Sequence, residues 1–302
     1  RGLPIWTLLG FTHHVAISMG CHLDPERFTL GPIEREERRR VWAGLMVLYT
    51  IQNTAFGSLD QQALPQDVKM PADIDDVDLL TSPSSKRPAP STFPHPTQMT
   101  YLLLNFRLYR TSSKICETIF SYPSTSRFTT SHLEAEIISV REMVEARYAA
   151  DPLLIHHQAN HHILYSQIHQ LLLLLLRPGL CRYLQGEITP ETCATRAKCI
   201  ASAKASLSIF ETLLETQSFK PYKWYTSGLG SFHAFHAAVT LAVILLIPES
   251  QSEYEEIKDI LDRALDMFAS LSVRSVFCSK AVPIIRQMMY VLHPILTYSP
   301  PD

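Results

Sequence analysis

Hydrophobic residues recur along most of this chain at spacings of three and four, which is the period of an amphipathic α-helix. After Ser131, for example, Leu133, Ile137, Val140 and Val144 fall on one helix face. Sustained alternation of polar and apolar residues between hairpin turns is missing, so a sheet is not supported. The pattern predicts an all-α fold of about nine helices, near residues 4–20, 32–57, 97–121, 131–149, 152–176, 190–217, 227–247, 252–272 and 276–297.

Local signals for helix starts support these helices. Ser131 with Glu134, and Ser250 with Glu253, have the spacing of capping boxes. Thr189 precedes a proline that suits a first helical position. We therefore expect helices to begin at these three points.

Residues 71–96 interrupt the helical pattern with a cluster of prolines and a Ser-Ser-Lys-Arg stretch. Proline at this density excludes a helix and favours extended chain. We interpret the segment as a long loop inside one large helical domain that spans residues 1–302, because the helices on both sides have apolar faces that must be buried together. Two domains split at this loop are the alternative.

Composition and charge limit the class of protein. Of 302 residues, 46% are hydrophobic and 19% charged, and the formal net charge is −2. Such a chain has enough apolar material for a large core, and its near-neutral balance argues against a surface devoted to nucleic-acid phosphates. The longest apolar run, Ala237 to Ile247, is too short for a membrane helix, so no membrane partner is expected. The chain opens inside an apolar pattern without an initiator Met, which indicates a piece of a longer protein.

A histidine cluster is the first candidate for chemistry. It comprises His156, His157, His161, His162 and His169. On a helix, His157 and His161 share a face, as the zinc-binding histidines of metalloproteases do, but the glutamate that such enzymes use as a base is missing. A polar, partly buried helix face is the simpler interpretation.

An aspartate cluster is the second candidate, and it comprises Asp73, Asp75, Asp76 and Asp78. It resembles the patch with which terpene cyclases hold magnesium diphosphate. Here the patch lies in the proline-rich loop, and the second metal motif of those enzymes is absent. The sequence also lacks a nucleophile elbow, a phosphate loop and a dinucleotide-binding turn. We assign no catalytic, cofactor-binding or metal residue; a metal-dependent all-α enzyme using Asp75 and Asp76, or His157 and His161, is the alternative.

Residues 34–40 form the densest charge block of the chain, with three adjacent arginines. Glu34 with Arg38, and Glu36 with Arg40, have the spacing of ion pairs along one helix. We interpret the block as a solvated helix face, whose glutamates offset the arginines and argue against DNA contact. An apolar stripe that begins at Trp42 continues the helix and is expected to enter the core.

Together these segments resemble the regulatory middle homology region of fungal binuclear zinc-cluster transcription factors. In that family a helix ends in Gly-Leu-His-x-Asp and the next opens with Glu-x-Arg-Arg-Arg-x-Trp; here Cys21 replaces the leucine. Leu175-Leu176-Arg177-Pro178 is similar to the family's Leu-His-Arg-Pro, which ends a helix. We expect structural roles for the residues that carry the resemblance, with the arginines stacking on Trp42 or capping carbonyls. They are Gly20, His22, Asp24, Glu37, Arg38, Arg39, Arg40, Trp42, Arg177 and Pro178.

The resemblance implies a regulatory domain of a nuclear transcription factor and not an enzyme. In the family, six cysteines of a separate N-terminal module hold two zinc ions and contact DNA. The six cysteines of this chain lack that spacing, so zinc and DNA are expected only in a module that precedes it. A small-molecule effector or a coregulator protein is the partner expected for the chain itself.

Overall fold

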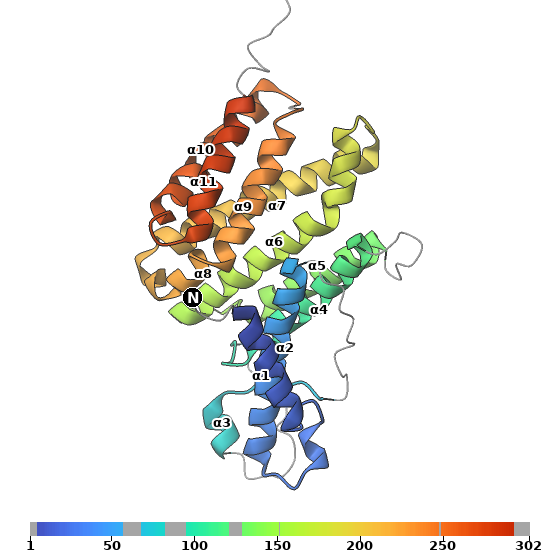
Figure 1. Cartoon of the computed structure of the whole chain (residues 1–302), viewed down its shortest axis with the longest axis vertical. Helices are drawn as coiled ribbons and strands as arrows, with labels where there is room; N and C mark the ends of the chain where they lie inside the picture. The colour runs from blue at the N-terminus through green and yellow to red at the C-terminus, as the bar shows by residue number, and fades with distance from the viewer. Residues whose placement is uncertain are drawn as a thin grey trace, which may run out of the picture. The chain divides into compact units, whose positions relative to one another are not determined.

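In a computed structural model of the chain, residues 5–56, 68–81, 95–120, 129–150, 152–247 and 249–292 are described. These residues form α-helices and two short 3₁₀ helices, with no strand among them (Figure 1). The all-α prediction is confirmed. The chain divides into two compact units, residues 1–153 and 154–302. This division does not lie in residues 71–96, where the two-domain alternative placed it, and the single-domain interpretation stays a prediction.

The described residues of unit 1 form five α-helices, with α2 and α4 at the centre. Its elements are α1 (Ile5–Ser18), η1 (Pro25–Arg27), α2 (Pro32–Phe56), α3 (Asp76–Thr81), α4 (Thr100–Phe120) and α5 (Thr130–Arg147). Helix α2 packs against α1 and α4, and α4 also packs against α5. Trp42 and Met46 of α2 are buried together with Leu9 and Ala16 of α1, as the apolar stripe predicted for this helix. The predicted inner face of α5 is also buried.

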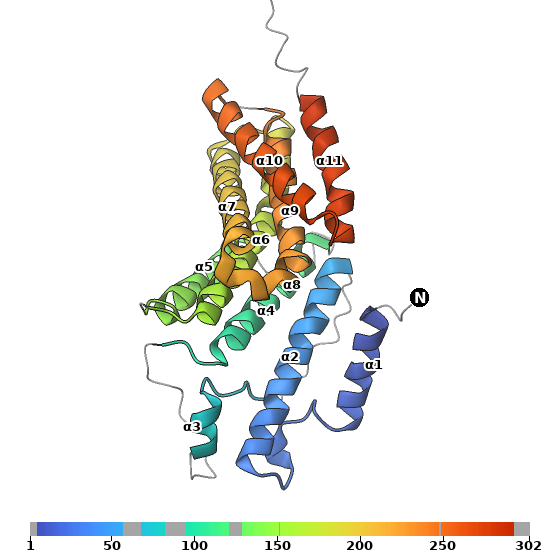
Figure 2. The same cartoon turned by 90° about the vertical axis from the view of Figure 1, so that its left-hand side faces the viewer.

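Unit 2 is built around α6, α7 and α9, with α10 and α11 packed against α9 (Figure 2). Its elements are α6 (Ile155–Leu184), α7 (Pro190–Glu215), η2 (Gln217–Tyr222), α8 (Lys223–Thr226), α9 (Leu229–Ile244), α10 (Gln251–Leu271) and α11 (Val276–Leu292). The core joins residues from five of them, including Leu173, Phe210, Leu241, Phe268 and Ile285. All nine predicted helices are therefore present, and α3 and α8 are additional.

Two of the three predicted helix starts are confirmed. Ser250 accepts the backbone N–H of Glu253 at 3.1 Å, and Thr189 forms a capping box with Thr192. The start predicted at Ser131 was wrong. Thr129 is the N-cap of α5, because it is the residue with extended backbone whose hydroxyl accepts a hydrogen bond from the helix.

The prediction that residues 71–96 contain no helix was wrong at α3. This helix has six residues and lies in a stretch without proline. Asp76 and Asp78 occupy its first turn, where the helix dipole favours carboxylates. Residues 82–94 of the segment lie outside the described residues.

Helix α6 also departs from its predicted end near residue 176. It continues through Pro178 to Leu184, so the Leu-Leu-Arg-Pro stretch does not end a helix here. A proline inside a helix removes one backbone hydrogen bond and bends the helix, but it does not forbid continuation. In Figure 1 the ribbon of α6 changes direction toward its C-terminal end.

Within the described part of the chain, no single helix has the length and apolar character needed to cross a membrane. Gln217–Thr226 and Leu229–Ile244 reach that threshold only as a pair, with an 80° bend between them.

Gly230 lies against the Tyr225 ring, and a methyl group there has no room. A Cβ on Gly230 would lie 2.7 Å from Cε1 of Tyr225 and 2.9 Å from its carbonyl oxygen. We expect Gly230→Ala to lower the free energy of unfolding by about 1–3 kcal/mol through overpacking, as measured by urea unfolding. Gly44→Ala is the control. No atom lies within 4 Å of its Cβ position, so the helix should gain about 0.5–1 kcal/mol. Equal effects at the two positions would contradict the packing argument.

Candidate functional site

Arg39 is buried in the segment that resembles the zinc-cluster family, with its side chain 4% exposed. Its Nη2 donates to Asp24 Oδ1 at 3.1 Å and to Glu26 Oε1 at 2.9 Å. Asp24 also accepts the backbone N–H groups of Lys69 at 2.9 Å and Glu26 at 3.0 Å. Burial raises the pKa of Asp24, but these backbone hydrogen bonds and Arg39 outweigh it and hold the pKa below its ordinary value. Asp24 is therefore an anion that joins α2, the loop after α1 and residue 69.

Glu36 and Arg40 extend this network to α3. Glu36 is 2% exposed and accepts the backbone N–H of Ala72 at 2.8 Å. Arg40 lies 3.4 Å from Glu36, and its Nη1 donates to Asp76 Oδ1 at 2.5 Å. Four segments of unit 1 are thus held together by charged hydrogen bonds.

The block of residues 34–40 is only partly the solvated face that we predicted. Both helical pairs are present, with Arg38 4.0 Å from Glu34 and Arg40 3.4 Å from Glu36. The interpretation as a solvated face was wrong for Glu36 and Arg39, because both find partners far along the sequence and are buried. Glu36 was absent from the residues we selected, although its pairing with Arg40 was a signal for it.

The aspartate cluster is used inside the fold. Asp73 accepts the hydroxyl of Thr97 at 2.6 Å and forms an ion pair with Arg147 of α5. Asp75 Oδ1 accepts the backbone N–H of Gln98 at 2.8 Å. These carboxylates fasten residues 73–76 to the residues just before α4 and to α5.

Gly20 and Arg38 shape the turn between α1 and α2. Gly20 has a φ of 75°, in the left-handed region that favours glycine, and a Cβ there would lie 3.1 Å from the Phe28 ring. Arg38 donates to the carbonyl of Met19 at 3.3 Å, and its guanidinium lies 5.5 Å from the centre of the Phe28 ring. The carbonyl is at the end of α1, so this arginine caps a helix and stacks on Phe28.

Trp42 stacks on a histidine. Its ring centre lies 5.8 Å from that of His13, which also stacks on Tyr49 at 4.6 Å. Burial, with the neighbouring His14 and His22, lowers the pKa of His13 and keeps the ring neutral. His22 is half-buried and Glu37 is exposed.

Arg177 and Pro178 belong to unit 2 and are exposed on α6. Nδ1 of His236 on α9 donates to Oε1 of Gln170 on α6 at 2.9 Å. Burial, together with the positive charge of Arg177, lowers the pKa of His236 to about 4. Arg177 thus acts on a half-buried histidine that was not among the candidate residues.

The five histidines at the start of α6 pack mainly against rings. The ring of His161 lies 4.7 Å from that of Tyr165, and the ring of His162 lies 5.6 Å from that of Phe219. Burial lowers the pKa of His162. Among the described residues, no three histidine, cysteine, aspartate or glutamate side chains are grouped as metal ligands. His157 and His161 therefore gain no third ligand from this part of the chain.

A buried polar cluster in unit 2 was missed entirely. Nδ1 of His233 lies 3.2 Å from the hydroxyl of Tyr225 and 3.3 Å from that of Ser166. Burial, with the neighbouring His236, lowers the pKa of His233 to about 3. Beside it, Cys278 Sγ donates to Ser231 Oγ at 3.3 Å. The only sequence signal was polar residues within the apolar stretch 229–244.

The six cysteines do not fit the binuclear zinc cluster that the family implies. All six are free, and Cys21, Cys116, Cys199 and Cys278 are buried. Burial, with Cys181 nearby, raises the pKa of Cys199 to about 12.

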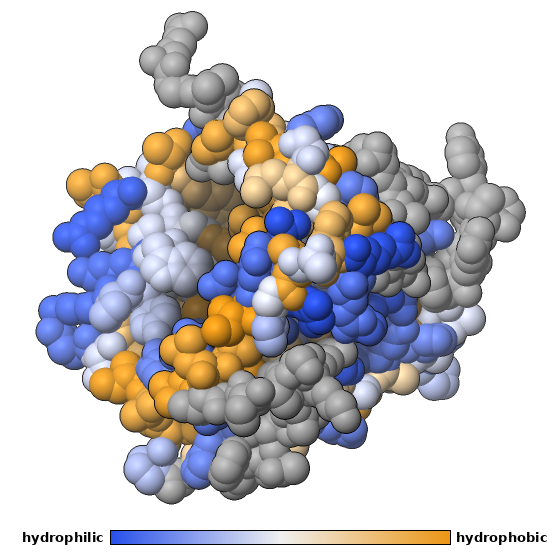
Figure 3. Space-filling view, turned by 90° about the horizontal axis from the view of Figure 1, so that it is seen from below, coloured by the Kyte–Doolittle hydropathy of each residue, from blue (hydrophilic) through white to orange (hydrophobic). Residues whose placement is uncertain are grey.

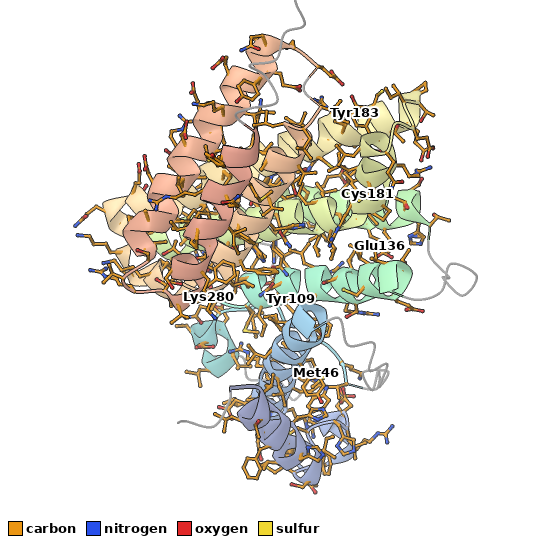
Figure 4. The ribbon with its side chains drawn as sticks, turned by 45° about the horizontal axis from the view of Figure 1, so that its top comes forward. Met46, Tyr109, Glu136, Cys181, Tyr183 and Lys280 are labelled. Carbon is orange, nitrogen blue, oxygen red and sulfur yellow. The ribbon has the colours of Figure 1, made fainter. Side chains whose placement is uncertain are left out.

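Unit 1 also contains a pocket of about 440 Å³ between α2, residues 68–71 and α4. Its apolar wall includes Trp42, Met46 and Phe106; Met46, on α2, is labelled in Figure 4. Arg39 of the charged network lies on the same wall. The network and the pocket together are the candidate site of this unit.

Comparison with known families identifies the class of protein. Residues 4–171, more than half of the chain, match the fungal specific transcription factor domain, and the chain belongs to this family. The resemblance stated from the sequence is confirmed.

Individual relatives agree with the family. Transcription factor FBD3 of Gibberella moniliformis is 26% identical over 116 residues, which are 38% of this chain and 14% of the relative. The fusarisetin A cluster transcription factor fsa6 of a Fusarium species is 41% identical over 68 residues, 22% of this chain and 8% of the relative. The pyriculol/pyriculariol biosynthesis cluster transcription factor 1 of Pyricularia oryzae is 31% identical over 121 residues, 39% of this chain and 16% of the relative.

The matched stretches thus span a small fraction of each relative's length. No solved structure matches the chain.

Proposed function

We propose that this chain is the regulatory part of a nuclear zinc-cluster transcription factor, without catalytic activity of its own. In this proposal a separate module, which holds the zinc and contacts DNA, selects the target genes, and the helical chain sets how strongly they are transcribed. Membership of the fungal specific transcription factor domain family carries the proposal. The carboxylates of Asp73, Asp75 and Asp76 form hydrogen bonds and an ion pair with other residues of unit 1. These contacts also support the proposal over a magnesium-dependent enzyme.

The names of two relatives extend the proposal to the target genes. One is named as a cluster transcription factor and another as a biosynthesis cluster transcription factor. We infer that the genes controlled through this chain form a biosynthetic gene cluster.

A reporter assay in a fungal host tests the regulatory role. A DNA-binding module of known site is fused to an activating segment, with or without the 302-residue chain between them. We expect the chain to change transcription of the reporter severalfold and to leave a reporter without the binding site unaffected, because a regulatory domain acts through the module that is bound to DNA. A fusion whose chain carries Gly230→Ala is the matched control. This substitution disturbs packing in unit 2, so the chain should then change transcription of the reporter less. Equal transcription with and without the chain would refute the proposal.

A further inference from the structure

The pocket of unit 1 has the size and lining of a small-molecule site. Its volume of about 440 Å³ lies within the roughly 300–1,000 Å³ typical of ligand pockets. Trp42, Met46, Val68 and Phe106 contribute apolar surface to its wall. On the face drawn in Figure 3, apolar and polar patches lie side by side. An apolar body of modest size therefore fits the interior of the pocket.

The polar part of the lining is mostly cationic. Arg39, Lys69, Arg110 and Lys114 carry positive charge, and Glu117 is the acidic residue of the lining. Three of the four cations have carboxylate partners outside the pocket: Lys69 lies 2.5 Å from Glu26, Lys114 lies 2.5 Å from Glu136, and Arg39 is held by Asp24. Arg110 is exposed and pairs with no described carboxylate. Its charge is available to an anion.

The guanidinium of Arg39 is already committed to the fold. Its side chain is 4% exposed, and its Nη2 forms ion pairs with both Asp24 and Glu26. Arg110 is therefore the cation of the lining that can bind an anion in the pocket.

We propose that this pocket binds a small carboxylate with an apolar body, which acts as the effector of the chain. The carboxylate oxygens accept from Arg110, while the apolar body lies against Trp42, Met46 and Phe106. Because Arg39 also joins α2 to the loop after α1, an occupied pocket stabilises the network around Asp24. The effector role rests on the proposed regulatory function, whereas the binding does not.

Calorimetric titration of the purified chain with octanoate and with 3-phenylpropanoate tests the site. Each acid is compared with its methyl ester, which keeps the apolar body and removes the charge. We expect saturable binding of at least one acid and roughly tenfold weaker binding of its ester, because the ester loses the charge-assisted hydrogen bonds. Failure of both acids to bind saturably, or equal affinity of acid and ester, would overturn the proposal.

Substitutions on α4 locate the bound anion. Arg110→Gln should weaken binding of the acid by roughly tenfold and leave the ester unchanged. Glu117→Gln should strengthen it, because a like charge is removed from the pocket wall. Arg107→Gln is the matched control, since Arg107 is an exposed arginine of the same helix that does not line the pocket. A loss at Arg107 equal to that at Arg110 would indicate general charge attraction and would refute the site.

The reporter assay separates the two proposals. If the acid binds with dependence on Arg110 but the chain has no effect on transcription, the pocket is supported and the regulatory function is refuted. If the chain regulates the reporter but neither acid binds, the pocket alone is refuted.

Discussion

Replacing Arg39 with alanine will destabilise the chain by about 3–5 kcal/mol, the range found when one partner of a buried ion pair is removed. The guanidinium is 4% exposed and the Asp24 carboxylate 9% exposed, so the substitution leaves a carboxylate away from water with only backbone N–H groups to stabilise it. The loss is measured as the change in unfolding free energy from urea titrations followed by far-UV circular dichroism.

Arg38→Ala is the matched control for this substitution, because it removes the neighbouring arginine of the same triplet. Arg38 is 27% exposed, and its pair with Glu34 at 4.0 Å should contribute less than about 1 kcal/mol. Arg38→Ala also removes the hydrogen bond to the Met19 carbonyl and the contact with Phe28, but it leaves no buried charge unpaired, so it should destabilise the chain less than Arg39→Ala does. A double-mutant cycle with Asp24→Ala measures the coupling between Arg39 and Asp24 directly. If Arg39→Ala destabilised the chain no more than Arg38→Ala does, the central role of Arg39 would be wrong.

The helices could be predicted from the sequence because their signal is local. Each of the nine carries an apolar face with a period of three to four, and burial of that face stabilises the helix. Helix α3 escaped prediction because six residues are too few to show a period, and the flanking prolines dominated the pattern. The end of α6 was misjudged because Pro178 was treated as a terminator, although a helix tolerates one proline by bending.

The charged network was predictable only where its partners share a helix. The pair of Glu36 and Arg40 follows from the geometry of one helix, whereas the contact of Arg39 with Asp24 depends on how the loop after α1 folds back. The partners of Asp24 and Glu36 at residues 69 and 72 lie still farther along the chain. No spacing in the sequence encodes such contacts. The sequence therefore does not show that Arg39 is buried whereas Arg38 and Arg40 are partly exposed.

Acidification will destabilise the chain through two histidines of unit 2, the buried His233 and the half-buried His236. The fold lowers the pKa of His233 to about 3 and that of His236 to about 4, in both cases mainly by burial. In the unfolded chain both imidazoles titrate near their ordinary pKa of about 6.5. Between these values the unfolded chain binds more protons than the folded one, so stability falls as the pH is lowered from 6.5 toward 4. Between pH 8 and pH 5 we expect each histidine to lower the free energy of unfolding by about 2 kcal/mol, and the pair to lower it by about 4 kcal/mol.

His236→Gln separates this effect from general acid denaturation. Glutamine retains a donor for Gln170, whose Oε1 lies 2.9 Å from His236 Nδ1, but it cannot be protonated in this range. Between pH 8 and pH 5 the free energy of unfolding should therefore fall by about 2 kcal/mol less in the variant than in the unaltered chain. Urea unfolding at each pH measures this difference. His156→Gln, at an exposed position of α6, is the control and should leave the pH dependence unchanged. Because the Asp24 carboxylate loses its proton well below pH 5, the network of unit 1 contributes little to this difference. If the His236→Gln variant kept the full pH dependence of the unaltered chain, His236 would not control the stability in acid.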